Sequence, residues 1–270
     1  RVLDSALVRV YLFGNYDEAF ANDLAKTLQS ALPEERAGAT EYARERVYAP
    51  VPGQTLVKNR DLPVEDLGMM LLYAAPEATV ANEATGRVLA RHLRNRAFDT
   101  LRTEEQLGYA AGGLTTTLQD HPMVGFYIQT PVKGPVAMLE RFEAFAGEYA
   151  LMLDELTEEQ FANLKSGVLT QLTEPPTNLS DEAGPFIGDW NRERYDFASR
   201  AEMINAVEAV SLDAMRDYYR ATVLSSEPSR ILIQMRGERW QAEPFATIEG
   251  ATVIESVEAF HEQMPLQPLD

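Results

Sequence analysis

The sequence has no cysteine among its 270 residues, and this absence removes several kinds of site at once. A disulfide framework, a zinc centre built on thiolates and a cysteine nucleophile are all excluded. No apolar run approaches the roughly 20 residues that a membrane-spanning helix needs. The lack of cysteine does not identify a compartment, because periplasmic and cytosolic proteins can both do without it.

Histidine is also scarce: there are three, and neither H-E-x-x-H nor H-x-x-E-H occurs. His92 has no second histidine at helical spacing, His121 is expected in a hairpin turn, and His261 lies in the C-terminal tail. Each is therefore interpreted as a surface or hydrogen-bonded histidine rather than a metal ligand. The sequence also lacks G-x-S-x-G and any phosphate-binding glycine motif. It predicts no metal, no cofactor and no self-sufficient catalytic centre in this chain.

Positive charge is the third shortage. There are 24 Lys and Arg residues against 42 Asp and Glu residues, which gives a net charge of -18. Such a field repels phosphate backbones, so binding to nucleic acid and to anionic membranes is disfavoured. We interpret the acidity as a solvated surface, and an acidic module that attracts basic peptides stays open as an alternative. Hydrophobic residues make up 45% of the chain, which is typical of a globular protein with a substantial core.

The pattern of apolar residues predicts alternating strands and helices. Strands are expected at 7–13, 54–58, 67–74, 107–118, 123–132 and 230–235, and helices at 15–32, 80–101, from Pro135 onward, at 157–172 and in two or three segments up to Leu224. This order indicates the α+β class, with a single mostly antiparallel sheet covered on one face by helices. No repeat or linker divides the chain, so residues 1–270 are expected to form one domain.

Three local signals sharpen this outline. Asn15 with Glu18, and Thr157 with Gln160, have the spacing of a capping box, in which each pair starts a helix. The adjacent glycines in the 107–118 strand, Gly112 and Gly113, indicate a bulge or a close backbone approach.

The connector Leu101–Tyr109, LRTEEQLGY, has an unusual composition for a helix-to-strand corner. Connectors are commonly rich in Gly, Asn, Asp, Ser and Pro, whereas this one carries an arginine, two carboxylates and a tyrosine. Arg102 at the end of the helix and Tyr109 at the start of the strand are expected to project side by side. Gly108 would allow the close backbone approach, and the leucines on each flank would anchor the corner in the core.

An arginine fork and a phenol are both hydrogen-bond donors, so together they suit a carbonyl that becomes an oxyanion, or a peptide backbone. A purely structural alternative stays open on spacing alone. In that reading Arg102 offsets the neighbouring glutamates and the carbonyls at the helix end, and Tyr109 is half-buried. Glu104 and Glu105 are adjacent and rarely converge on one substrate atom, so they are interpreted as a solvated pair.

The same nine residues closely resemble the L-R-T-x-E-Q-L-G-Y signature of the pitrilysin/insulinase family of zinc metalloendopeptidases. The resemblance extends over nearly the whole chain. It includes Gly14-Asn15, the segment GFYIQT at 125–130, LTEEQF at 156–161 and QMPL at 263–266. The chain is similar to the last of the four homologous domains of such a protease, and the fold that this implies is the pitrilysin/processing-peptidase-like domain.

The resemblance implies a role for each candidate residue. In the family, the N-terminal half carries the inverted zinc motif and its glutamate base, and the C-terminal half closes over it to enclose a peptide in a chamber. The residues that match Arg102 and Tyr109 would hold the scissile peptide and stabilise the tetrahedral intermediate. Zinc ligands do not occur here, so this chain is expected to be inactive alone. Its expected partners are the zinc-bearing N-terminal half of the same polypeptide and a peptide substrate, and family resemblance favours the periplasm.

One alternative belongs to another functional class. Relatives with this fold include scaffold subunits without proteolytic activity, in which the parent polypeptide would also lack the zinc motif. The sequence ahead of this region in the parent distinguishes the two, because an H-x-x-E-H there indicates a protease.

Overall fold

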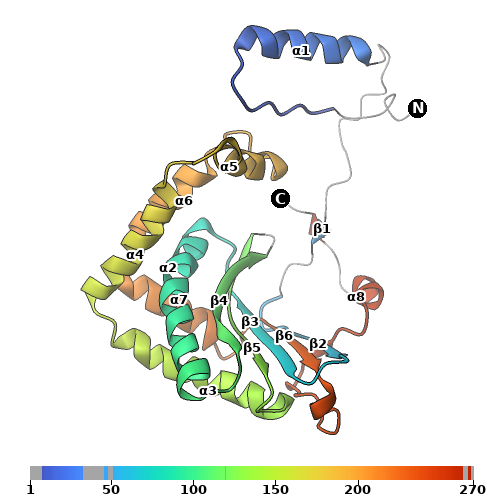
Figure 1. Cartoon of the computed structure of the whole chain (residues 1–270), viewed down its shortest axis with the longest axis vertical. Helices are drawn as coiled ribbons and strands as arrows, with labels where there is room; N and C mark the ends of the chain where they lie inside the picture. The colour runs from blue at the N-terminus through green and yellow to red at the C-terminus, as the bar shows by residue number, and fades with distance from the viewer. Residues whose placement is uncertain (1–7, 33–45, 48–50, 119, 264–266, 269–270) are drawn as a thin grey trace. The chain divides into compact units, whose positions relative to one another are not determined.

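The structure is a computed structural model that describes residues 8–32, 46–47, 51–118, 120–263 and 267–268 (Figure 1). It divides the chain into two compact units, which are described separately. The smaller unit comprises residues 1–46, 174–200 and 268–270, and the larger unit comprises residues 47–173 and 201–267. The organisation of 1–270 as one domain stays a prediction.

The larger unit is built on a mixed six-stranded sheet in the order β4-β5-β3-β6-β2-β7. The strands are β2 (Thr55–Asp61), β3 (Leu67–Ala74), β4 (Ala110–Leu118), β5 (His121–Thr130), β6 (Arg230–Arg236) and β7 (Thr252–Val253). Pairing is antiparallel from β4 through β5 and β3 to β6, and β2 joins both β6 and β7 in parallel. The α+β class is therefore confirmed, with parallel pairing at one side of a mostly antiparallel sheet.

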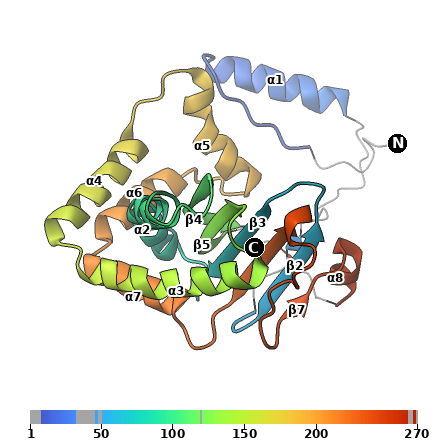
Figure 2. The same ribbon diagram turned by 60° about the horizontal axis from the view of Figure 1, so that its bottom comes forward.

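Helices cover one face of this sheet (Figure 2). Those in contact with the strands are α2 (Val80–Ala97), α3 (Pro135–Asp154) and α7 (Leu212–Val223). Further elements are α4 (Glu158–Thr173), α6 (Ser199–Ala209), a 3-10 turn at Glu238–Trp240, α8 (Val257–Gln263), and the two-residue strands β1 (Arg46–Val47) and β8 (Gln267–Pro268). The core lies between helices and sheet, where Leu71 and Phe126 pair across strands and the rings of Phe126 and Phe145 meet edge-on at 5.4 Å.

Long apolar segments and capping signals produced the most accurate predictions. The continuous run 67–74 coincides with β3, which is buried at most positions and lies inside the sheet. At the start of α4, the Thr157 hydroxyl accepts from the Gln160 backbone N–H at 3.2 Å, and the Gln160 side chain accepts from the Thr157 N–H at 3.0 Å. This is the reciprocal bonding expected of a capping box. The Gly112-Gly113 pair marks close packing, not a bulge: the β4–β5 register is unbroken, and a Cβ at Gly113 would lie 2.5 Å from Leu93.

In the smaller unit, the prediction of a strand at 7–13 is wrong for the residues described. Residues 8–13 are not assigned to a strand, and Leu7 lies outside the described residues. A turn at Gly14 leads to α1 (Glu18–Ala31), and the unit also holds α5 (Leu179–Asn191). The predicted cap on α1 is also wrong. Asp17, rather than Asn15, accepts the Phe20 backbone N–H at 2.8 Å, because its extended backbone directs the carboxylate toward the first turn.

The hairpin boundaries differ from the prediction by a few residues. β4 begins at Ala110 rather than Leu107, and β5 spans His121–Thr130 rather than 123–132. His121, expected in the turn, is therefore the first residue of a strand and pairs with Leu118. Among the residues that the structure describes, no helix is long and apolar enough to cross a membrane.

Candidate functional site

The Arg102–Tyr109 corner is formed by a π-helix, where the sequence pattern indicated a continuing α-helix. α2 stops at Ala97, and Phe98–Glu104 continues as a π-helix in which the Glu105 N–H bonds to the Thr100 carbonyl at 3.0 Å. The wider turn brings the Leu107 N–H to 3.0 Å from the Leu101 carbonyl, and both leucines are buried. The predicted leucine anchors therefore exist, but they hold a π-helix, a conformation often found at functional sites.

Gly108 lets this corner lie against the neighbouring strand. A Cβ at that position would be 2.0 Å from the backbone oxygen of Gln129 in β5, so no side chain fits. Just before it, Gln106 has a positive φ of 54°, the left-handed conformation that non-glycine residues rarely adopt. Thr130 adds a hydrogen bond from its hydroxyl to the Leu107 carbonyl. The backbone that leads to Tyr109 is therefore fixed by close packing and hydrogen bonding.

Arg102 and Tyr109 lie together, as the sequence analysis expected. The Arg102 guanidinium carbon is 4.8 Å from the centroid of the Tyr109 ring and 4.5 Å from that of Phe98. Both distances are within the range of cation–π contacts. Tyr109 is 86% exposed and Phe98 38% exposed, so the arginine is stacked against two aromatic rings at the surface of the larger unit.

Stacking uses the flat faces of the guanidinium and leaves its N–H groups, which lie in the plane, free to donate. Neither Arg102 nor Tyr109 makes a side-chain hydrogen bond or ion pair with any part of the chain that the structure describes. The structural alternative, in which Arg102 offsets its neighbouring glutamates and Tyr109 is half-buried, is not what the geometry shows. The corner presents one charged and one neutral hydrogen-bond donor to its surroundings.

The two adjacent glutamates have different surroundings. Glu104 is exposed, whereas Glu105 accepts from the Arg141 Nε atom with both carboxylate oxygens, at 3.0 and 2.9 Å. Arg141 is on α3 and also binds Glu148 at 2.8 Å. Hydrogen bonding to Glu105, and then to Glu148, raises the pKa of Arg141 above its ordinary value. The prediction of a solvated pair therefore holds for Glu104 only, and Glu105 ties the corner to α3.

The three histidines do not gather into a site. His92 is buried in α2, and its Nδ1 atom is 2.9 Å from the Tyr149 hydroxyl. Burial, and then the charge of Arg96, lower the pKa of His92 to about 4. Among the described residues, no group of three or more His, Cys, Asp or Glu side chains could hold a metal ion. The donor set of this part of the chain therefore does not fit zinc.

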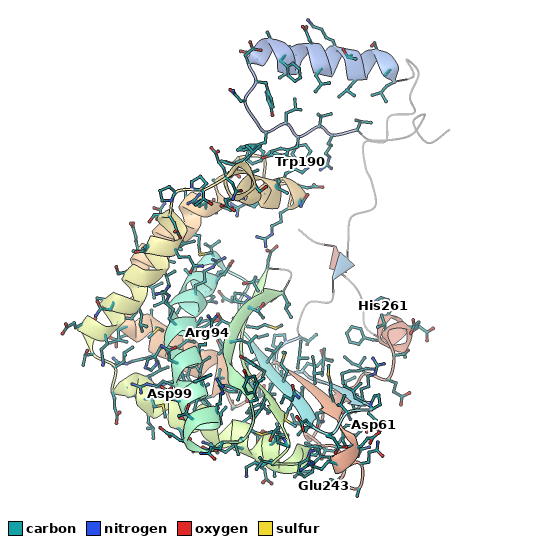
Figure 3. The ribbon with its side chains drawn as sticks, in the orientation of Figure 1. Asp61, Arg94, Asp99, Trp190, Glu243 and His261 are labelled. Atoms are coloured by element: carbon teal, nitrogen blue, oxygen red, sulfur yellow. The ribbon has the colours of Figure 1, made fainter. Side chains whose placement is uncertain are left out.

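Sequence reasoning missed two residues that shape the corner, Phe98 and Arg141. Phe98 lies four residues before Arg102, a spacing that places two side chains on the same side of a helix, so the stack had a local signal. Arg141 is 36 residues from Glu105, so no local sequence pattern indicated their contact. In Figure 3 the labels of Arg94 on α2 and Asp99 on the π-helix locate the start of the corner.

Comparison with known proteins gives several matches. A family model described as PQQ synthase PqqF-like, C-terminal lobe domain 4, matches residues 88–187, which include the corner. The chain is 26% identical to Protease 3 of Escherichia coli O6:H1 over 256 residues, covering 94% of this chain and 26% of that protein. It is 23% identical to a putative zinc protease, mug138, of Schizosaccharomyces pombe, covering 95% of this chain and 28% of that protein.

A solved structure of pitrilysin agrees in fold with a TM-score of 0.85 and 25% sequence identity, covering 95% of this chain and 27% of that one. The chain thus spans about a quarter of the length of the proteins it matches. These matches agree with the resemblance that the LRTEEQLGY motif carries. The chain is therefore similar to the pitrilysin family of peptidases, and the part of these proteins that it resembles is the C-terminal domain.

Proposed function

We propose that this domain holds the peptide substrate of a pitrilysin-like zinc metalloendopeptidase, whose zinc-bearing N-terminal half belongs to the same polypeptide. The observation that carries the proposal is the exposed stack in which Arg102 lies against Phe98 and Tyr109 with its polar atoms unpaired among the described residues. Such a stack fixes a flexible side chain in one orientation before any ligand arrives, which lowers the entropy cost of binding.

The two donors suit the chemistry of peptide hydrolysis. A peptide carbonyl accepts hydrogen bonds, and its oxygen gains negative charge as a nucleophile adds to the carbon. In the proposed role, Arg102 provides a full positive charge and in-plane N–H donors near that oxygen, and the Tyr109 hydroxyl provides a second donor. Their effect is therefore larger in the transition state than on the bound substrate, which is the requirement for catalysis.

Zinc has no place in the described part of this chain. The family chemistry needs a metal and a general base, and the donor set here fits neither. We assign both to the N-terminal half of the parent, together with the chamber that the two halves enclose. On its own, the purified 270-residue chain is expected to bind no zinc and to cleave no peptide. By family resemblance we propose the periplasm as its compartment.

A scaffold role is the second candidate, because the same fold serves in subunits without proteolytic activity. Arg102 and Tyr109 have no side-chain hydrogen-bond partner among the described residues, and this favours the peptidase role, since a scaffold gains nothing from two such donors at its surface. An acidic peptide-binding module without a protease parent has only the net charge of -18 in its favour. Titration of a basic peptide against the chain at two salt concentrations tests that reading.

The decisive experiment compares variants in the full-length parent enzyme. Arg102→Ala and Tyr109→Phe are each expected to lower kcat/KM for a peptide substrate by about 100-fold, the usual loss for one oxyanion donor. The thermal unfolding temperature should change little, because Tyr109 is exposed and Arg102 is only partly buried. Arg94→Ala is the matched control, since Arg94 is an exposed arginine on α2 outside the stack. Wild-type rates in both test variants would reject the proposed function.

A further inference from the structure

Arg141, on α3, is bound to a carboxylate on each of two sides. Its Nε atom donates to both carboxylate oxygens of Glu105, at 3.0 and 2.9 Å, and its Nη2 atom donates to Glu105 as well. On the other side, Nη1 and Nη2 donate to Glu148 at 3.2 and 2.8 Å. The side chain of Arg141 is 14% exposed, so the guanidinium is largely shielded from solvent. Bidentate pairs of this kind hold both partners in one geometry.

Arg141 is also held by contacts within its own helix. Glu148 lies seven residues further along α3, and the guanidinium carbon of Arg141 is 5.8 Å from the centroid of the Phe145 ring, four residues along. Phe145 is itself fully buried in the core. Because these contacts do not involve Glu105, α3 presents Arg141 as a fixed docking point for the end of the π-helix.

Glu105 closes the helical turn that contains Arg102. The Glu105 N–H bonds to the Thr100 carbonyl at 3.0 Å, and Arg102 lies inside the turn that this bond closes. The next residue, Gln106, has the positive φ of 54°, which surrounding contacts must impose on a residue other than glycine. On one side of it Leu107 is buried, and on the other side Glu105 is held by the guanidinium on α3.

We propose that Arg141 is a positioning residue for the peptidase reaction. Through Glu105 it fixes the π-helical turn that carries Arg102, and so directs the Arg102 guanidinium toward the scissile peptide. This inference rests on the proposed function. Without the Arg141–Glu105 pair, the last turn can open and the Gln106 backbone can relax, and both movements displace Arg102. A displacement of about 1 Å is enough to cost up to roughly 100-fold in rate.

The position of Tyr109 depends much less on this pair. Three residues separate Tyr109 from Glu105. Gly108, directly before the tyrosine, lies against the backbone of β5, where no side chain fits. This contact holds the start of β4 without help from α3. Arg141 is therefore expected to act through Arg102 and not through Tyr109, which gives the proposal a specific test.

Steady-state kinetics of the full-length parent enzyme with a peptide substrate provides that test. Arg141→Met is expected to lower kcat by about 10-fold and to change KM by less than about 2-fold, because the contact made by Arg102 is stronger in the transition state. In the Arg102→Ala background, Arg141→Met should cause no further loss, whereas in the Tyr109→Phe background the 10-fold loss should remain. Wild-type kcat in Arg141→Met, or an equal further loss in both backgrounds, would overturn the proposal.

Arg216→Met is the matched control for lost stability. The Arg216 side chain, on α7, is 20% exposed and pairs with Asp213 at 3.1 Å. It also donates to the carbonyl of Leu153, which is 12 residues, or about 18 Å, beyond Arg141 along α3. Arg216→Met should lower the thermal unfolding temperature about as much as Arg141→Met and leave kcat unchanged. An equal fall of kcat in the two variants would identify lost stability as the cause and would overturn the proposal.

Two milder variants keep the proposal testable where Arg141→Met folds poorly. Glu105→Gln and Arg141→Lys each keep a hydrogen bond across the pair but lose part of the charged, bidentate contact. Each should lower kcat by about 3-fold, again only when Arg102 is present, and wild-type kcat in both would overturn the proposal. Such a failure, with intact effects of Arg102→Ala and Tyr109→Phe, leaves the proposed function standing. Wild-type rates in those last two variants would instead reject the proposed function itself.

Discussion

The corner at 98–109 and the segment at 8–31 both match strong sequence patterns, yet only the corner is anchored by buried residues of its own unit. The corner is anchored by the buried Leu101 and Leu107, by Gly108 against β5 and by Glu105 on Arg141. The segment 8–31 has no buried residue. The comparison shows that the spacing of apolar residues predicts which side of a helix or strand will be buried. Whether the helix or strand is stable depends on the residues that pack against that side.

The largest expected effect tests the backbone contact at the corner. Gly108→Ala should lower the free energy of unfolding by about 3 kcal/mol, because the new Cβ would lie 2.0 Å from the Gln129 oxygen and the chain must move. Urea unfolding of the isolated chain measures this. Gly147→Ala makes the same chemical change within α3, where a Cβ meets nothing within 4 Å, and should stabilise the chain by about 0.5 kcal/mol. Equal effects at the two positions would contradict the close contact at Gly108.

Sequence patterns predicted the elements whose burial is decided locally. The 67–74 run is β3 to the residue, and the stripe that includes Met138, Phe142 and Phe145 is buried in α3. The position of Arg102 beside Tyr109 was also predicted, because a helix end and a strand start bring them within reach. In each case the determining neighbours are close in sequence or share one periodic face.

The remaining features depend on residues that are far apart in the chain. The π-helix at 98–104 replaces the predicted last turn of α2, and packing of Leu101 and Leu107 accompanies that change. The parallel β2–β6 pair joins residues about 175 positions apart, as in Thr55 with Arg230. Glu105 binds Arg141 across 36 positions. A single sequence gives no periodic signal for such pairings.

The next-largest effect is a pH dependence of the free energy of unfolding, which arises from His92, a residue buried in α2. The buried His92 has its pKa lowered to about 4, so the folded protein resists a proton that the unfolded chain accepts near pH 6.5. The free energy of unfolding should therefore decrease as the pH falls from 6.5 toward 4, by about 2 kcal/mol after allowance for solvent screening. His92→Gln should flatten this part of the profile, measured by urea unfolding at several pH values.

The exposed His261 provides the control for that experiment, since His261→Gln makes the same chemical change on α8 without a buried environment. Its pH profile should follow that of the wild type. A profile that flattens equally in both variants would show that burial of His92 is not the cause.

A smaller effect is expected for the ion pair that ties the corner to α3. A double-mutant cycle with Glu105→Gln and Arg141→Met should give a coupling energy of about 1 kcal/mol, because the pair is bidentate and Arg141 is only 14% exposed. Arg220 and Asp217 form a looser pair at 4.0 Å with 45% and 82% exposure, and the same cycle there should give nearly zero. Urea unfolding of the single and double variants provides both values, and equal coupling would mean that Glu105 does not anchor the corner.

The smallest expected effect lies in the segment 8–31 and tests the comparison directly. In the isolated chain, Leu24→Ala should change the free energy of unfolding by less than about 0.5 kcal/mol, because Leu24 has no core to leave. Leu93→Ala on α2, where the leucine is fully buried, should cost about 3 kcal/mol. A large cost of Leu24→Ala in the isolated chain would mean that α1 is stabilised by its own unit, and the contrast between the two regions would disappear.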